Sequence, residues 1–201
     1  MNLDNKVIFT TNSIIKDTLI SKFSLKKEIT TEYEIYSGKR ESDDSIDSII
    51  IVYCKIEKLK ETVFYVKENY IIQKFILLGS SFIARNQDIE TGDIMIPNSF
   101  IDENGDNPIF LEYAVGENFD LNKFGLILNG VCSDKVKDTE IINSDESYFD
   151  IFDHDSYNFL KCLTKEDLEL AVVIRVCIKD ESDIENNYFI ENLLNIVDVM
   201  I

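Results

Sequence analysis

Short apolar runs alternate with amphipathic stretches along most of the chain. The apolar runs are continuous and of strand length, which predicts strands buried on both faces. The predicted strands are residues 7–10, 31–36, 46–52, 75–78, 92–97, 124–128 and 171–178. Stretches with helical spacing of apolar residues lie between most of them, and these predicted helices are residues 13–23, 58–70, 148–163 and 184–199. The pattern predicts an α/β fold with a mixed, mostly parallel central sheet.

Five of the apolar segments are expected to be neighbouring strands of one sheet, because helical stretches separate most of them. These segments are residues 48–53, 75–79, 93–97, 124–129 and 171–177. Polar stretches are expected as a surface loop over 38–47, a turn over 104–108 and a polar connection over 134–147. A chain of 201 residues suffices for one sizeable core, so residues 1–201 are expected to form a single domain.

The charge of the chain bounds its partners. Asp and Glu number 38 against 20 Lys and Arg, a formal net charge of -18. Nucleic acid requires a basic face, so we expect no nucleic-acid partner, and the same charge repels anionic membranes. No apolar run approaches the length of a membrane span, and the first residues do not resemble a signal peptide. We therefore expect a cytoplasmic protein without a membrane partner.

The four cysteines favour a reducing compartment. Cys54, Cys132, Cys162 and Cys177 lie far apart and in or near apolar runs, so buried reduced thiols are expected. The single histidine lacks the partners of a metal site, and no phosphate-binding loop motif occurs. The sequence therefore predicts no metal and no cofactor.

Two acidic clusters flank the last predicted strand. Asp153 and Asp155 stand two apart at a predicted helix start, and Asp180 and Asp183 follow the strand. Ligands of open α/β sheets bind beyond the carboxyl ends of strands, so these acids could hold a polyol and protonate a leaving group. Asp153 as a helix cap, and the second cluster as a solvated loop, are the simpler interpretations.

Three further residues invite both a functional and a structural interpretation. Gly79 could let backbone amides and the Ser80 hydroxyl approach an anion or a water, or could simply end its strand. Arg175 lies within an apolar strand and requires a carboxylate partner there, for which Asp153 is a candidate.

Four segments, in order, resemble the superfamily of nucleoside phosphorylases and methylthioadenosine/adenosylhomocysteine nucleosidases. The segments are residues 75–81 (FILLGSS), 92–97 (GDIMIP), 152–157 (FDHDSY) and 171–183, in which AVVIRV is followed by an Asp-x-x-Asp pair. The resemblance covers roughly residues 45–200. It implies a three-layer α/β/α sandwich, usually assembled as a homodimer, that cleaves the N-glycosidic bond of a purine nucleoside.

The resemblance also implies roles for individual residues. Asp155, with Asp153 beside it, would bind the ribose, and His154 would pack on the sugar. Ser80, after Gly79, would lie near the attacking water or phosphate. Asp180 would protonate the purine, provided that one inserted residue shifts it from the position held by Lys179.

The departures from the superfamily favour hydrolysis over phosphorolysis and leave three functions open. Phosphate needs cations, and the chain has only Arg40, Arg85 and Arg175 as arginines. The leading hypothesis is a hydrolytic purine nucleosidase. The alternatives are a catalytically degenerate member that binds a nucleoside or a protein partner, and a structural subunit that pairs with an active homologue.

Overall fold

The fold is seen in a computed structural model of the chain. The structure describes residues 5–28, 32–41, 46–84, 89–102, 107–112, 127–128, 131–133, 150–185 and 187–200. The strands are β1 (Asn5–Thr10), β2 (Lys26–Lys27), β3 (Glu34–Glu41), β4 (Ile46–Tyr53), β5 (Ile72–Ile83), β6 (Ile94–Met95), β7 (Ser99–Ile101), β8 (Ile109–Phe110), β9 (Ile127–Leu128), β10 (Val131–Ser133), β11 (Ile151–Phe152) and β12 (Ala171–Ile178). The helices are α1 (Ser13–Phe23), α2 (Leu59–Asn69), α4 (Ser156–Leu160), α5 (Lys165–Leu168) and α6 (Asn187–Met200), with 3₁₀ turns η1 (Ile56–Lys58) and η3 (Glu181–Glu185).

All described strands belong to one mixed sheet. Its centre is the row β4, β1, β5 and β12, in which each neighbouring pair is parallel. The sheet continues from β12 through the antiparallel β6 to β9. The five segments predicted as strands of one sheet are therefore confirmed, with β1 between β4 and β5 and with only Ile127 and Leu128 of the fourth segment described.

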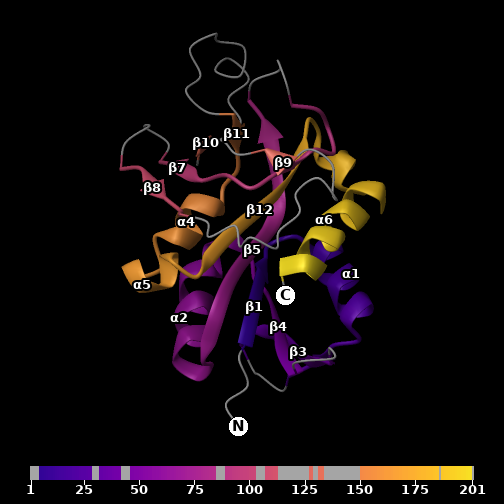
Figure 1. Ribbon diagram of the computed structural model, residues 1–201, viewed down its shortest axis with the longest axis vertical. Helices are drawn as coiled ribbons and strands as arrows, with labels where there is room; N and C mark the ends of the chain where they lie inside the picture. The colour runs from indigo at the N-terminus through magenta and orange to yellow at the C-terminus, as the bar shows by residue number, and fades with distance from the viewer. Residues whose placement is uncertain are drawn as a thin grey trace.

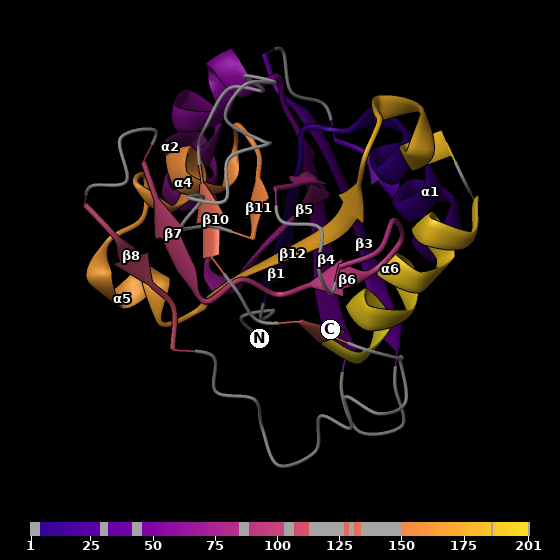
Figure 2. The ribbon, with the colours of Figure 1, turned by 90° about the horizontal axis from the view of Figure 1, so that it is seen from above.

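Helices cover both faces of the sheet, as the continuous apolar strands predict. Figure 1 shows α2, α4 and α5 on one side and α1 and α6 on the other, and Figure 2 shows the same two layers from above. Successive residues of a strand point to opposite faces. In β12, Val173 packs in the core under α2 and α4, whereas Val172 and Ile174 pack in the core under α1 and α6. The result is the expected α/β/α arrangement.

The loop predicted over residues 38–47 is wrong throughout its described part. Strand β3 continues through Gly38 to Glu41, and its partner β4 starts at Ile46. Gly38 pairs with Ile49 and Lys39 with Ser48. The backbone ladder with the apolar β4 holds these residues in a strand, and strands near a sheet edge tolerate polar side chains.

Two further local predictions are corrected by the structure. Gly79, Ser80 and Ser81 do not end their strand, because β5 runs on to Ile83 and β12 pairs with it up to Phe82. The helix predicted over 148–163 is much shorter in its described part, since β11 occupies residues 151–152 and α4 spans only Ser156–Leu160. Residues 104–106 of the turn predicted over 104–108, and the whole polar segment 134–147, lie outside the described residues.

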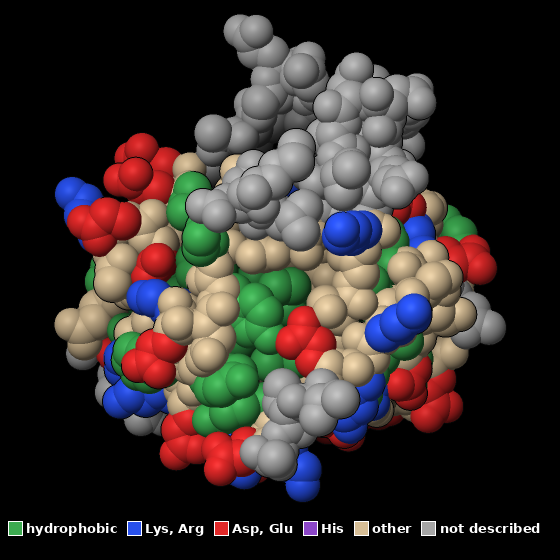
Figure 3. Space-filling model, turned by 90° about the horizontal axis from the view of Figure 1, so that it is seen from below, with side chains coloured by type: hydrophobic (Ala, Val, Ile, Leu, Met, Phe, Trp, Pro, Cys, Tyr) green, Lys and Arg blue, Asp and Glu red, His purple; other side chains and the backbone are tan. Residues whose placement is uncertain are grey.

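Within the described part of the chain, no helix has the length and apolarity needed to cross a membrane. All four cysteines are free thiols. Cys54, Cys132 and Cys177 are buried as predicted, whereas Cys162 is only partly buried. Figure 3 shows the face seen from below, where acidic and basic side chains surround a central apolar area.

Candidate active site

A cavity of about 520 Å³ opens at the carboxyl ends of the central parallel strands, which is a size suited to a small organic ligand. Segments that follow β1, β4, β11 and β12 contribute to it, together with β5 itself. Its described lining residues are Thr11, Asn12, Lys55, Ile56, Glu57, Ser80, Phe82, Asp153, His154, Asp155, Ile178, Glu181 and Ile184. The cavity therefore lies where the sheet topology predicts a ligand site.

The base of this site lies where one edge of β5 is left unpaired between two neighbouring strands. Strand β1 ends at Thr10 opposite Leu78, and β11 pairs with β5 again only at Phe82 and Ile83. The segment that joins β11 to α4 carries Asp153 and Asp155 to this unpaired edge.

Arg175 is the central cation at the base of the site. It is fully buried, on the same face of β12 as Val173, and therefore points toward α4. Gly79 lies directly opposite it on β5, and a Cβ at Gly79 would stand 1.9 Å from Arg175 Nη1. The glycine thus leaves room for the guanidinium, which is a different role from the strand-ending turn that the sequence suggested.

Asp153 binds this guanidinium and is saturated with donors. Its Oδ2 lies 3.2 Å from Arg175 Nε and accepts hydrogen bonds from Ser81 Oγ at 2.7 Å and Ser156 Oγ at 2.7 Å. The Cys132 thiol donates to the same oxygen, and Oδ1 accepts the backbone N–H groups of residues 155 and 156. Asp153 is therefore a structural anchor and the predicted partner of Arg175. It is not the predicted helix cap, because the N-cap residue of α4 is Asp155.

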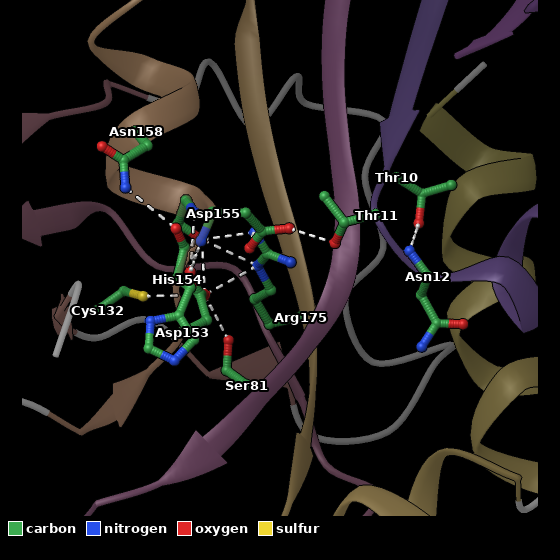
Figure 4. Close-up of polar contacts among 11 residues, drawn as sticks. Thr10, Thr11, Asn12, Ser81, Cys132, Asp153, His154, Asp155, Asn158 and Arg175 are labelled. Atoms are coloured by element: carbon green, nitrogen blue, oxygen red, sulfur yellow. Dashed lines mark hydrogen bonds and ion pairs between the residues drawn. The ribbon is translucent and has the colours of Figure 1, made fainter. Parts of the chain in front are cut away.

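Asp155 is held by one donor at each carboxylate oxygen. Arg175 Nη2 lies 2.7 Å from Oδ1, and the Thr11 hydroxyl donates to Oδ2 at 2.8 Å. Figure 4 shows the Asp155 carboxylate between Thr11 on one side and Asp153 with Arg175 on the other. Asp155 is buried yet lines the cavity, so lone pairs not used by these two donors can receive hydroxyl groups of a ligand.

The two carboxylates share one cation and differ in proton affinity as a result. Burial raises the pKa of Asp155 to about 6, and the charge of Asp153 acts in the same direction against Arg175. Burial would also raise the pKa of Asp153, but Arg175 and hydrogen bonds from Ser81 and Ser156 outweigh it and hold that pKa below its usual value. The carboxyl of Asp153 is thus biased toward the ionised form, whereas the carboxyl of Asp155 is biased toward the protonated form.

Solved structures with a similar architecture include nucleosidases. A mutant of futalosine hydrolase of Helicobacter pylori is 14% identical with a TM-score of 0.70, and 97% of this chain covers 99% of that one. The 5′-methylthioadenosine/S-adenosylhomocysteine nucleosidase of Neisseria meningitidis, in complex with methylthio-immucillin-A, is 12% identical with a TM-score of 0.72, with 96% and 94% of the two chains covered. The corresponding enzyme of Campylobacter jejuni is 15% identical with a TM-score of 0.68, over 98% of this chain and 96% of that one.

This chain has the fold of these nucleosidases. Protein-family models and curated protein sequences give no match to the sequence. The similarity of fold was therefore recognised by comparison of structures. The fold is also the one expected from the superfamily that the four sequence segments resemble.

Most of the predicted binding residues come together within this nucleosidase fold. Asp153, His154, Asp155 and Ser80 all line the cavity, and His154 is exposed there. Gly79 lies beneath Arg175, within 3.9 Å of Asp155 Oδ2 when a Cβ is placed on it. Their roles toward a substrate stay predictions.

Asp180 lies apart from this group. It is exposed, it is not among the described lining residues, and its Oδ1 accepts the backbone N–H and the hydroxyl of Ser182. The adjacent Glu181 lines the cavity instead. Asp183 accepts the backbone N–H groups of Lys179 and Asp180 and so shapes the turn after β12. The proposed role of Asp180 as proton donor stays a prediction.

Sequence reasoning missed Thr11, Ser81, Ser156 and Glu181. Alternation along β5 was a usable signal for Ser81, because residues 79 and 81 share a face with each other and, given the register, with Arg175. No comparable signal marks Thr11, whose place depends on the distance in space between the end of β1 and the β11–α4 connection.

In the described part of the chain, no three His, Cys, Asp or Glu residues are placed to hold a metal ion.

Proposed function

We propose that this chain cleaves the N-glycosidic bond of a purine ribonucleoside, with water as the attacking group. The observation that carries the proposal is the Asp155 carboxylate, which lines a cavity of about 520 Å³ in a fold shared with nucleosidases. Because it is fixed at both oxygens, this carboxylate can accept the two hydroxyl groups of a ribose diol.

The charge of the cavity favours water over phosphate as the attacking group. Lys55 is the single cation among the lining residues that the structure describes, against four carboxylates, Glu57, Asp153, Asp155 and Glu181. Arg175 lies beneath the cavity, where its guanidinium already binds Asp153 and Asp155. A phosphate ion entering this cavity would meet an excess of like charge.

The proposed mechanism stabilises charge on the sugar and on the leaving base. Positive charge develops on the ribose as the bond breaks, and the nearby Asp155 carboxylate stabilises it. Ser80 would lie near the water, and His154 would pack beside the sugar. The departing purine needs a proton, for which Asp180 is the predicted donor.

Substitution of Asp155 tests the proposal. Asp155→Asn keeps the shape of the side chain but loses the ionised acceptor, and hydrogen bonds to charged groups contribute about 1.5–3 kcal/mol. We therefore expect kcat/KM to fall about 10- to 100-fold. The measurement is release of free base from adenosine, 5′-methylthioadenosine and S-adenosylhomocysteine, with and without phosphate. Asp17→Asn, which removes an exposed carboxylate elsewhere, is the matched control and should leave turnover unchanged.

Two variants in the same assay identify the proton donor. Loss of turnover in Asp180→Asn supports the predicted residue. Loss in Glu181→Gln alone moves the role to the residue that lines the cavity.

A nucleoside-binding protein without catalysis is the second candidate. It is favoured by the position of Asp180, which accepts hydrogen bonds from Ser182 and does not line the described cavity. If the wild type binds these nucleosides in calorimetry but releases no base from any of them, cleavage is refuted and this alternative holds.

We also propose a homodimer, since the resembled superfamily usually forms one. A stable dimer interface buries a sizeable surface with an apolar centre, and Figure 3 shows an apolar area on one face of the molecule. Light scattering at micromolar concentration should give twice the mass of the 23.2 kDa chain. A monomer mass under these conditions would count against the homodimer.

A further inference from the structure

Thr11 occupies a fixed position between a strand end and a helix cap. Thr10 closes β1, is fully buried, and accepts the backbone N–H of Asn12 through its Oγ1 at 3.2 Å. Asn12 in turn caps α1, because its side chain accepts the backbone N–H groups of Ile14 and Ile15. Since the backbone is held on both sides, Thr11 has little freedom to move relative to the site.

The Thr11 hydroxyl lines the cavity and reaches the carboxylate that we assign to the ribose. It donates to Asp155 Oδ2 at 2.8 Å, while Arg175 holds Oδ1 at 2.7 Å. The two donors come from β12 and from the end of β1, so they approach the carboxylate from different elements (Figure 4).

We propose that Thr11 is a positioning residue, which fixes Asp155 Oδ2 so that both carboxylate oxygens face a ribose diol at once. The inference rests on the proposed function. Arg175 alone would hold only one oxygen, and the carboxylate could then turn about its last bond. Two hydroxyl groups can be bound together only if both oxygens stay in place, and small errors of position are costly for binding and catalysis.

The hydroxyl also influences the charge of Asp155, which gives the proposal an independent measurement. A hydrogen bond to the ionised form lowers the pKa of a carboxyl, so loss of the Thr11 hydroxyl should raise the pKa of Asp155 above its value of about 6. Among the described residues, the other charged or titratable groups near Asp155 are Arg175, Asp153, Cys54, and the cavity residues His154, Lys55, Glu57 and Glu181. Burial raises the pKa of the Cys54 thiol to about 12, so it stays neutral and does not obscure the titration.

The test compares Thr11→Val with Thr11→Ser in the full chain. Valine keeps the shape and removes the hydroxyl, whereas serine retains it. Thr18→Val is the matched control, because the Thr18 hydroxyl donates to Ile14 O within α1, away from the cavity. The first readout is the titration of the Asp155 carboxyl followed by carbon NMR without ligand. The second is the affinity for 5′-methylthioadenosine as a function of pH.

In Thr11→Val we expect the titration midpoint of Asp155 to rise and the nucleoside affinity to fall about three- to tenfold, which is the effect of one lost hydrogen bond. The decrease in nucleoside affinity at low pH should also shift to higher pH, together with the titration midpoint of Asp155. Thr11→Ser and Thr18→Val should resemble the wild type in both readouts.

The two readouts separate the inference from the proposed function. An unchanged Asp155 midpoint in Thr11→Val overturns the inference, even if the wild type cleaves nucleosides. An unchanged affinity in a variant whose midpoint has risen overturns the positioning role. If the wild type binds no nucleoside while the midpoint rises as expected, the proposed function fails and the Thr11–Asp155 coupling is still supported.

Discussion

Arg175→Met is expected to lower the free energy of unfolding by about 3–5 kcal/mol, the usual cost of removing one partner from a buried ion pair. The guanidinium is fully buried and is bound to Asp153 and Asp155, so methionine would leave two carboxylates without a counter-charge in the interior. Urea unfolding followed by far-ultraviolet circular dichroism measures the loss. Lys22→Met is the control, because Lys22 and Asp198 form a partly exposed ion pair that should contribute less than about 1 kcal/mol.

The pH dependence of the stability of Arg175→Met identifies the cause of the lost stability. Without Arg175, burial and mutual repulsion raise the pKa of both carboxyls above their unfolded values. The folded variant then binds more protons than the unfolded chain, so its stability falls as pH rises through that window. We therefore expect a larger deficit relative to the wild type at about pH 8 than at about pH 5. An equal deficit at both values would show that the two carboxylates do not depend on Arg175.

The central sheet was predictable because its physical signal is local and strong. A strand buried on both faces is apolar at every position, and the runs around Ile50, Ile76 and Val173 show this without ambiguity. Hairpin β3–β4 was missed at its polar end, because the stretch that includes Gly38 and Lys39 has no apolar pattern of its own. Its strand conformation comes from pairing with β4, a contact that the local sequence does not display.

The candidate site was predictable in part, for a related reason. Asp153 and Asp155 stand out because two carboxylates flank a short segment, and Arg175 stands out as a charge in an apolar strand. The role of each acid depends on which oxygen meets which donor. Asp153 is saturated by donors that include Ser81 and Ser156, whereas Asp155 accepts one hydrogen bond at each oxygen. This difference appears only in the folded chain.

The turn after β12 shows most clearly which features of the site the sequence does not determine. Motif spacing placed the proton donor at Asp180, after one inserted residue. The turn that follows β12 decides which side chain faces the cavity, and it brings Glu181 to the lining while Asp180 accepts hydrogen bonds from Ser182. A shift of one residue in a turn changes the direction of a side chain, and spacing alone does not determine it.

Gly79→Ala should be about as damaging as loss of the buried ion pair, about 3–5 kcal/mol of unfolding free energy, together with loss of nucleoside cleavage. A Cβ at this position would stand 1.9 Å from Arg175 Nη1 and 3.1 Å from Cζ. The end of an arginine is normally free to move aside, but here its other nitrogens are held by Asp153, Asp155 and Ser156 in a fully buried site. The methyl group must therefore displace the guanidinium from its carboxylates.

Gly38→Ala is the matched control, in a strand of the same sheet. Its Cβ would meet Leu25 Cδ2 at 2.5 Å, and Leu25 lies at the edge of the core, where its side chain can rotate away. The decisive comparison is a double-mutant cycle with Arg175→Met, which removes the group that the new methyl would contact. In that background Gly79→Ala should cost about 1–3 kcal/mol less than in the wild type, as measured by urea unfolding. Strict additivity of the two substitutions would show that Gly79 is needed for the backbone of β5 and not for the guanidinium.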